Sequence, residues 1–332
     1  MRVVRVARYP QGIPQADDFA LDTAPLPVPG PGQVLLRNLW LSIDPYLRPL
    51  LAGRYVVPRP PLGACVPGGS LARVVGGGAL AEGTLVVADT GWSEYAVADA
   101  GSVRVVPDDG LPPTTALGVL GIPGLTAWAG MRTIADPRPG ETVLVSTAAG
   151  AVGSVAGQLA RIAGCRVVGI AGGAGKCRIA TREFGFDACV DHRAGDLVAA
   201  LREACPDGVD VYFDNVGVQV LEAALACLRR RARIVLCGLS GQYNDAVPPP
   251  GPHLGPVIGA RARMEGLVVY DHLHRFEAFR EEVAPLLRSG ALRYREHVHE
   301  GLERAPEAFV SLMQGGNLGK ALVRLHGTGE ER

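Results

Sequence analysis

Residues 141–176 read ETVLVSTAAGAVGSVAGQLARIAGCRVVGIAGGAGK, and this stretch decides the fold. Thr142 to Ala148 is a short run of apolar and β-branched residues, as expected of a buried parallel strand. After a glycine turn, apolar residues recur at the spacing of one helix face, and Gly164 stands where a helix C-cap is expected. A second strand is predicted from Arg166 to Ala171. The stretch therefore predicts a strand, a turn, a helix and a second strand.

The turn AAGAVGS places Ala148, Gly150 and Gly153 at the three positions of a dinucleotide-binding fingerprint, with alanine in place of the first glycine. The middle glycine leaves room for a pyrophosphate against the backbone, and the third lets helix and strand pack closely. A helix that begins here directs free N–H groups and its positive dipole end toward phosphates. Together with Ala151 and Val152, these residues form the predicted phosphate-binding turn.

The second strand ends without a carboxylate. Sites that prefer NAD place Asp or Glu at this point to bind the ribose 2′-OH, whereas this chain has Gly172, Gly173, Gly175, Lys176 and Arg178. Small residues and a cation suit a 2′-phosphate, so the sequence predicts NADP(H) rather than NAD(H). The alternative is that Lys176 and Arg178 are solvated residues that open the next helix.

Composition limits the class of protein. With 332 residues the chain is long enough for two domains. Its formal net charge of zero argues against nucleic acid as a partner. No apolar run reaches membrane-spanning length, and the opening MRVVRVARYP lacks the pattern of a signal peptide, so we expect a soluble, cytoplasmic protein with no membrane partner.

Cysteines and histidines give no metal signal. The seven cysteines are scattered without a C-x-x-C pair, which favours neither a disulfide framework nor structural zinc. Two H-x-H pairs, His272 with His274 and His297 with His299, have no cysteine nearby and are predicted to face solvent.

Two different secondary-structure patterns follow one another along the chain. Twelve of the 26 prolines precede residue 68, which predicts short strands and turns rather than long helices. From about Leu117, strand and helix patterns alternate, which predicts a doubly wound parallel sheet with the nucleotide across the carboxyl ends of its strands. After residue 176 we expect helices near 177–184, 196–204, 220–231 and 274–290, and strands at 188–192, 209–217 and 232–238.

Seven further motifs are found along the chain. They are WLSIDPYLRP (40–49), GWSEYAV (91–97), LGVLGIPGLTAW (117–128), FDNVG (213–217), CGLSGQYN (237–244), RMEGLVVY (263–270) and GGNLGKALVRL (315–325). With these motifs the whole chain resembles the medium-chain dehydrogenase/reductase superfamily, in its zinc-free branch of prostaglandin reductases, alkenal double-bond reductases and NADPH-dependent curcumin reductases. GIAGGAGKCR followed by CVDH is most similar to the bacterial curcumin-reductase subgroup.

The resemblance implies an α/β fold with two domains. Residues 1–118 and 292–332 are expected to form a GroES-like β-rich catalytic domain, and residues 119–291 a Rossmann NADP(H)-binding domain, with the active site in the cleft. It also implies a homodimer in which edge strands of the Rossmann sheets meet. Segment 53–70 is shorter than the family pattern, which is expected to affect the pocket.

The resemblance assigns cofactor roles to single residues. Gly150 and Gly153 would face the pyrophosphate, and Gly172 and Lys176 would receive the 2′-phosphate. His192 stands where the mammalian branch has a tyrosine that assists with this phosphate. Because histidine titrates near neutrality, cofactor binding is expected to depend on pH.

Four residues are implied on the nicotinamide side: Thr126, Asn215, Asn317 and Tyr243. Each has a structural alternative. Thr126 could start a helix, and Asn215 could shape the turn before Gly217, because Asn tolerates left-handed backbone. Asn317 could be a turn residue between glycines, and Tyr243 could anchor the following proline-rich loop by packing.

Tyr46 in DPYLR and Tyr243 in GQYN are the implied catalytic residues, with packing as the alternative role for Tyr46. Asp44 and Arg48 are expected to hold their own loop together rather than to touch substrate.

The implied reaction is saturation of the C=C bond of α,β-unsaturated ketones and aldehydes, such as 2-alkenals, curcumin or prostaglandin-like enones. It is a zinc-independent, NADP-dependent oxidation–reduction of the CH–CH class, with hydride added to the β-carbon. A tyrosine or ribose hydroxyl would stabilise the developing enolate, and the α-carbon proton would come from a tyrosine or water. The alternatives are an NADPH quinone reductase and a non-catalytic NADPH-binding redox sensor.

Overall fold

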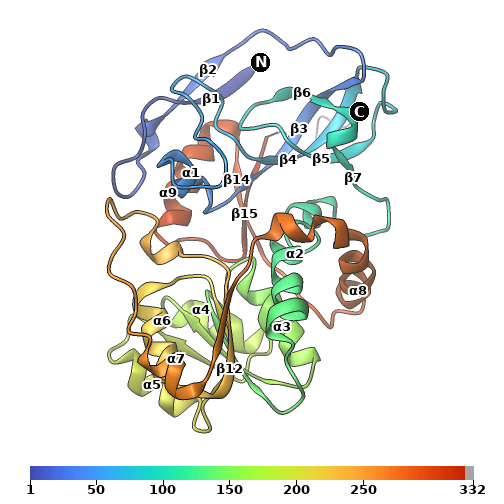
Figure 1. The fold of residues 1–332 in the computed structure, drawn as a ribbon. Helices are drawn as coiled ribbons and strands as arrows, with labels where there is room; N and C mark the ends of the chain where they lie inside the picture. Colours follow the sequence, from blue (N-terminus) through green and yellow to red (C-terminus); the bar gives the residue numbers. More distant parts are fainter. Residues whose placement is uncertain (326–332) are drawn as a thin grey trace. The chain divides into compact units, whose positions relative to one another are not determined.

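The computed structural model describes residues 1–325, and contacts divide the chain into two compact units (Figure 1). Unit 1 combines residues 1–117 with the segment that starts at Glu296, and unit 2 is the continuous stretch Gly118–Arg295. The junctions implied by the resemblance, after residues 118 and 291, lie one and four residues away from these. The functions assigned to the two units remain predictions.

Unit 1 is built from antiparallel strands with one parallel pair. Its larger sheet has the order β14-β15-β3-β4-β5-β7, with β6 also paired to β3, and β1 and β2 form a separate hairpin. The strands are β1 (Arg2–Val6), β2 (Phe19–Thr23), β3 (Gln33–Ile43), β4 (Gly69–Gly76), β5 (Leu85–Asp89), β6 (Tyr95–Asp99), β7 (Arg104–Val105), β14 (Glu296–Glu300) and β15 (Lys320–Arg324). β14 runs parallel to β15, which in turn pairs with β3 antiparallel.

Helices in unit 1 are short, as the prolines predict. The α-helices are α1 (Leu47–Leu51) and α9 (Ala305–Met313), and the 3-10 turns are η1 (Ala16–Asp18), η2 (Ala100–Ser102), η3 (Pro113–Leu117) and η7 (Leu302–Arg304). Residues from both ends of the sequence share one apolar core, in which Phe19 packs edge-on against Phe309 at a centroid distance of 5.9 Å. The last segment of the chain is therefore an integral part of unit 1.

Unit 2 is a six-stranded parallel sheet in the order β10-β9-β8-β11-β12-β13. Its strands are β8 (Thr142–Ser146), β9 (Arg166–Ala171), β10 (Ala188–Asp191), β11 (Val209–Asp214), β12 (Leu228–Leu236) and β13 (Arg263–Gly266). Its helices are α2 (Ile122–Ala129), α3 (Gly153–Ile162), α4 (Ala174–Arg182), α5 (Leu197–Ala204), α6 (Val218–Leu225), α7 (Gly255–Ala260) and α8 (Phe276–Arg288), with a π-helical turn η4 (Gly130–Ala135) and 3-10 turns η5 (Ser240–Gln242) and η6 (Val269–Arg275).

The sheet of unit 2 is covered on both faces, because side chains alternate along each strand. One face presents Leu144, Ile170, Tyr212 and Ile234 to the apolar residues of α5, α6 and α7. The opposite face meets α3 and η4 at positions where only glycine fits. A Cβ on Gly157 of α3 would lie 2.0 Å from Cζ of Phe186, and one on Gly130 would lie 2.6 Å from the ring of Phe213. The predicted fold class, a GroES-like β-rich domain plus a doubly wound Rossmann sheet, is confirmed.

Two predicted boundaries are wrong for local reasons. The first strand was expected to reach Ala148 but ends at Ser146, because Thr147 adopts a left-handed backbone with φ 52°. The helix expected over 220–231 ends at Leu225, and Leu228 already begins strand β12. Within residues 1–325, no helix is both long and apolar enough to cross a membrane.

Candidate functional site

The glycine turn between β8 and α3 has the geometry that its sequence predicts. A Cβ on Gly153 would lie 2.4 Å from the carbonyl oxygen of Thr147 and 2.8 Å from that of Ser146, so this glycine permits close contact between helix and strand. Gly150 is less constrained, since its Cβ would lie 3.2 Å from the Thr147 oxygen. Val152 is the N-cap of α3 and gives no side-chain hydrogen bond to the helix end. The first N–H groups of α3 thus have no side-chain cap, which suits a pyrophosphate.

At the carboxyl ends of β9 and β10, four residues form what we name the cationic corner: Gly172, Lys176, His192 and Arg193. A Cβ on Gly172 would lie 3.0 Å from both Nε of Arg193 and Nε2 of His192. Glycine at this position therefore leaves the two donor groups room to approach the strand end. Lys176 lies in the first turn of α4 and is half-buried, whereas Arg178 is exposed. Both residues lie on the helix that the alternative assigns to them, and only Arg178 is fully exposed, so the role of Lys176 in binding the 2′-phosphate stays a prediction.

Burial and like charge act together in the cationic corner. The pKa of Lys176 is lowered, first by burial and then by the charge of Arg193. The pKa of His192 is lowered in the same way, with Asp191 opposing the shift. The carboxylate of Asp191 accepts hydrogen bonds from the backbone N–H groups of Gly173 (2.8 Å) and Arg193 (3.0 Å), so it ties the two strand ends together. An incoming phosphate would relieve the repulsion between these cations.

Asn215 joins two neighbouring strands of the sheet. Its Nδ2 donates to the carbonyl oxygen of Ser146 at 2.9 Å, and its backbone N–H donates to Oγ of Ser146 at 2.7 Å. The preceding Asp214 is fully buried, and its carboxylate accepts bonds from the hydroxyl of Tyr212 and the N–H of Gly217. In the turn that follows, the positive φ values belong to Gly217 and Val218 rather than to Asn215. Asn215 therefore fixes the end of β11 by side-chain bonding, not by its own backbone shape.

Tyr243 follows η5, close to the carboxyl end of β12. Its hydroxyl accepts a hydrogen bond from the N–H of Leu239 at 3.2 Å, and a Cβ on Gly238 would lie 3.4 Å from this oxygen. Burial raises the pKa of Tyr243 above its ordinary value, and the protonated hydroxyl can donate a hydrogen bond. Its placement beside the β12 turn supports a chemical role and also the loop-anchoring alternative.

Thr126 lies inside α2 and does not start it. The N-cap is Gly121, and the Thr126 hydroxyl donates to the carbonyl oxygen of Ile122 at 2.7 Å, one turn earlier. The expected default role of Thr126 as a helix start is wrong, because Pro123 already occupies the first turn. Its side chain is 9% exposed.

In unit 1, Tyr46 precedes α1 and stacks on Tyr55 of the short 53–70 segment, with ring centroids 5.4 Å apart. Asp44, two residues earlier, accepts a bond from Nζ of the buried Lys320 at 2.5 Å, and Lys320 also donates to the carbonyl oxygen of Ile43 at 2.9 Å. Arg48 is buried and donates to the carbonyl oxygen of Gly12 from Nε and Nη2. Asp44 and Arg48 hold this region together, as expected.

Asn317 closes the turn before β15, where its Nδ2 donates to the carbonyl oxygen of Gly319 at 2.9 Å. This bond agrees with the turn alternative and leaves its cofactor role a prediction.

The remaining groups with a sequence-based expectation are the two H-x-H pairs and the cysteines. His297 and His299 stack with ring centroids 4.9 Å apart on β14 and are half-buried, so they face solvent only in part. His274 is exposed and His272 half-buried. The cysteines are free thiols, and no group of three or more His, Cys, Asp or Glu side chains in residues 1–325 is arranged to hold a metal ion.

Sequence reasoning missed two residues that the structure brings into these regions. Arg193 directly follows His192 in the sequence DHR. This arginine after the predicted strand could have indicated an additional cation at the 2′-phosphate site. Lys320 lies in the GGNLGK motif beside Asn317, but only the fold reveals that it pairs with Asp44, 276 residues away.

Comparisons with known proteins identify the family of the chain. Residues 2–106 match the family described as "N-terminal domain of oxidoreductase", and residues 151–288 match "Zinc-binding dehydrogenase". The NADPH-dependent curcumin reductase of Escherichia coli (strain K12) is 40% identical over 331 residues, which cover 97% of this chain and 96% of that protein. The chain belongs to the medium-chain dehydrogenase/reductase family.

Within this family the similarity points to one branch. The 2-alkenal reductase (NADP(+)-dependent) of Nicotiana tabacum is 39% identical, covering 96% of each chain. The crystal structure of CurA in complex with NADPH from Vibrio vulnificus is 39% identical, covers 98% of this chain and 100% of that one, and superposes with a TM-score of 0.93. A quinone oxidoreductase of Escherichia coli in complex with NADPH, at 21% identity, covers 98% and 100% with a TM-score of 0.80 and shares the fold alone.

Proposed function

We propose that this protein is an NADPH-dependent reductase that saturates the C=C bond of α,β-unsaturated ketones and aldehydes. The observation that carries the proposal is the cationic corner, which gathers Lys176, His192 and Arg193 around Gly172 at the strand end that selects the cofactor. It is combined with about 40% identity over nearly the full length to a curcumin reductase and a 2-alkenal reductase.

The residues present fit the cofactor. The uncapped start of α3, with Gly150, Ala151, Val152 and Gly153, would hold the pyrophosphate, and the cationic corner would hold the 2′-phosphate. Thr126, Asn215, Tyr243 and Asn317 remain proposed contacts on the nicotinamide side. Bound NADPH supplies the hydride that is added to the β-carbon.

The protein's own part in the reaction is to bind, orient and polarise. As charge moves onto the substrate carbonyl oxygen, a hydroxyl that donates to this oxygen stabilises the developing enolate. Tyr243 is our first candidate, because its hydroxyl lies beside Leu239 and Gly238, just after the carboxyl end of β12, and Tyr46 is the second. The α-carbon then takes a proton from a tyrosine hydroxyl or from water.

Further parts of the proposal concern the whole protein. We propose that it acts without zinc in the cytoplasm, on 2-alkenals, enones or curcumin- and prostaglandin-like compounds. We also propose a homodimer, which is supported by β13 being an edge strand of the parallel sheet and free to pair with a second copy.

The test is turnover with purified protein. NADPH consumption is measured with 2-alkenals, cyclic and acyclic enones, curcumin and quinones, with NADH as the control, and products are identified by mass spectrometry. We expect a saturated ketone or aldehyde from NADPH and much slower turnover with NADH. Turnover of quinones alone would establish the quinone reductase instead, and NADPH binding without any turnover would favour a redox sensor.

A further inference from the structure

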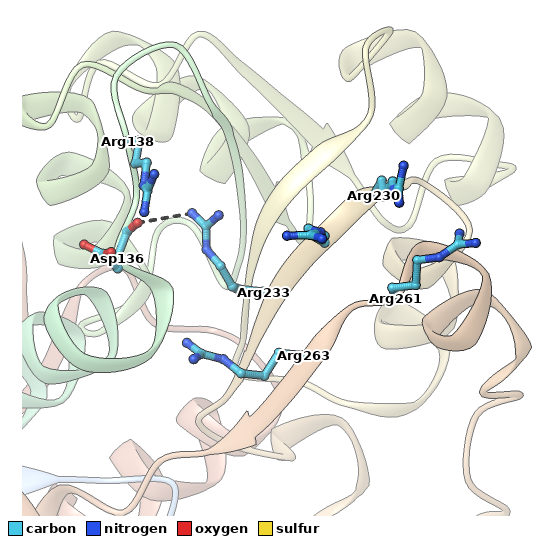
Figure 2. Close-up of a pocket in the computed structure, with 7 residues that line it drawn as sticks. Asp136, Arg138, Arg230, Arg233, Arg261 and Arg263 are labelled. Atoms are coloured by element: carbon cyan, nitrogen blue, oxygen red, sulfur yellow. Dashed lines mark hydrogen bonds between the residues drawn. The ribbon is translucent and has the colours of Figure 1, made fainter.

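A second charged region lies in unit 2, away from the cofactor turns. It is a pocket of about 620 Å³ beside the amino-terminal parts of β12 and β13 and the loop that leads into β8 (Figure 2). We name it the arginine pocket, and its lining residues are Asp136, Arg138, Arg230, Arg231, Arg233, Arg261 and Arg263. The glycine turn and the cationic corner lie at the carboxyl ends of strands in the same sheet. The two regions therefore lie at opposite ends of the strands of one parallel sheet.

The lining is almost entirely cationic. Six of its seven residues are arginines, and Asp136 is the only acid among them. Two glutamates outside the lining, Glu141 and Glu265, pair with Arg233 and Arg263. Six positive charges against these three negative ones leave an excess of three, in a protein whose formal net charge is zero. Charge of one sign is therefore concentrated here.

Two of the arginines have a structural reason to be present. Arg233 donates to the carbonyl oxygens of Ala135 (2.6 Å) and Asp136 (3.2 Å), and Arg263 donates to that of Ile134 (2.5 Å). These carbonyls end η4, where a cation interacts favourably with the helix dipole. Figure 2 shows both side chains extending from neighbouring strands toward the region of Asp136.

The other four arginines have no such reason. Within residues 1–325, no carboxylate forms an ion pair with Arg138, Arg230, Arg231 or Arg261, and the one side-chain bond among them joins Nη1 of Arg261 to the carbonyl oxygen of Gly259. These four side chains are exposed, so water screens the repulsion between them, and an anion that contacts several of them would bind to a surface of one charge sign.

The backbone holds these side chains in unusual positions. Of the five non-glycine residues with positive φ in residues 1–325, three line this pocket: Asp136 (40°), Arg231 (65°) and Arg261 (52°). Strand β12 also bulges here, since Val209 pairs with Leu228 but Val211 already pairs with Arg233. The residues between them leave the regular ladder, and bulges and strained backbone of this kind commonly place side chains at functional sites.

We propose that the arginine pocket binds a compact polyanion with at least three negative charges, such as a chain of phosphate groups, at the same time as NADPH occupies its own site. Guanidinium groups bind phosphate oxygens through paired N–H donors, and six arginines line this space. No apolar or aromatic side chain lines the pocket to receive a nucleobase. The pocket volume lies in the range of small-molecule sites.

The test uses tripolyphosphate as the probe on the full-length protein, by isothermal titration calorimetry at low ionic strength. The protein is first saturated with NADPH so that the cofactor site is filled. We expect tripolyphosphate to bind, with affinity that falls as salt is added. Absence of binding overturns the proposal. Binding that appears only when NADPH is omitted also overturns it, because the anion then enters the cofactor site.

The variant pair is Arg230→Gln with Arg231→Asn, since Asn tolerates the left-handed backbone at position 231. The matched control is Arg182→Gln with Arg202→Gln, two exposed arginines on α4 and α5 that remove the same charge from the same unit. We expect at least tenfold weaker binding for the first pair and less than a twofold change for the control, with NADPH affinity unchanged in the first pair. Equal losses in both pairs overturn the proposal.

Two further outcomes identify a different occupant. If a short DNA duplex binds the arginine pocket as tightly as tripolyphosphate does, the pocket is a general polyanion-binding surface. This result would contradict the proposal of a compact ligand. If wild-type protein does not bind tripolyphosphate and the first variant pair changes the oligomeric state measured by light scattering, the arginines belong to a contact with a second copy.

Discussion

The cationic corner of unit 2 and the region around Asp44 in unit 1 each contain one of the two lysines of this chain, which has 31 arginines. Lys320 is 4% exposed and its ammonium contacts the carboxylate of Asp44 and a backbone carbonyl. Lys176 is half-buried, and the charged group that shifts its pKa is the cation Arg193. The first lysine forms a buried ion pair within the protein, and the second lies beside another cation, Arg193.

The difference distinguishes a structural cation from one that we propose binds a ligand. A buried ion pair with a backbone bond satisfies its own charge and needs nothing from outside. A cluster of cations beside a glycine and the end of a strand is stabilised when an external anion arrives. Position along the sequence does not make this distinction, because both lysines follow closely after glycine residues.

The largest effect is expected from Lys320→Met. It removes the cationic partner of the largely buried Asp44 carboxylate, which within residues 1–325 then keeps only the hydrogen bond from the Ser42 hydroxyl, and we expect a loss of about 3 kcal/mol in the free energy of unfolding. Urea denaturation followed by circular dichroism measures the loss. The control is Arg324→Met on the same strand, whose ion pair with Glu300 is exposed and contributes at most about 1 kcal/mol. A similar small loss in both variants would contradict the structural role of Lys320.

Lys176→Ala is expected to weaken NADPH binding about 10- to 100-fold, because a charge-assisted hydrogen bond to the 2′-phosphate is lost. NADH lacks this phosphate, so its affinity should change less than about twofold. Fluorescence titration of both cofactors gives the ratio. Arg178→Gln on the same helix is the matched control and should leave the ratio unchanged, as its side chain is exposed. If both cofactors lose affinity equally, Lys176 does not recognise the phosphate.

The variants Tyr243→Phe in unit 2 and Tyr46→Phe in unit 1 compare the contributions of the two tyrosine hydroxyls to catalysis. We expect Tyr243→Phe to lower kcat for an enone about tenfold, since a hydroxyl donor to the developing oxyanion is removed while other hydroxyls still contribute. NADPH affinity should stay within about twofold. Single-turnover kinetics measures the hydride step. A larger loss in Tyr46→Phe would assign the main polarising role to unit 1.

The smallest effect concerns pH. Burial and Arg193 lower the pKa of His192 in the free protein, and a bound phosphate would raise it. A group whose pKa rises on binding favours the complex as pH falls through the pKa of the complex. NADPH affinity should therefore rise about threefold more between pH 8 and pH 6.5 in the wild type than in His192→Asn. The titration of the 2′-phosphate itself is common to both proteins and cancels. Identical pH profiles would remove His192 from the phosphate site.

Regular patterns along the chain predicted most of unit 2. The apolar run before the glycine turn and the helical spacing after it fix β8 and α3, because both depend on neighbours in sequence. The segment LRRRARIVL was misread in part, since three successive arginines fit an exposed helix end as well as an exposed strand. Its strand character depends on pairing with β11 and β13, which are distant in sequence.

The candidate site was predictable at positions where only one residue type fits the local geometry. Gly153 and Gly172 are examples, because any Cβ there meets neighbouring atoms at 3.0 Å or less. The bonds of Asn215 to Ser146 and of Lys320 to Asp44 were not predictable, since they join segments that only the folded sheets bring together. The same reason explains why the arginine pocket left no motif: its residues come from three separate segments.

The split of unit 1 into two sequence segments has a consequence for synthesis of the protein. Unit 2 is continuous, so all of its strands have left the ribosome once Arg295 has emerged, and it can fold as a unit. The sheet of unit 1 must wait for β15, which lies between β3 and β14 and supplies Val323 to the shared core. We therefore expect the first 117 residues to expose strand edges and apolar side chains during translation, which favours aggregation until β15 has emerged.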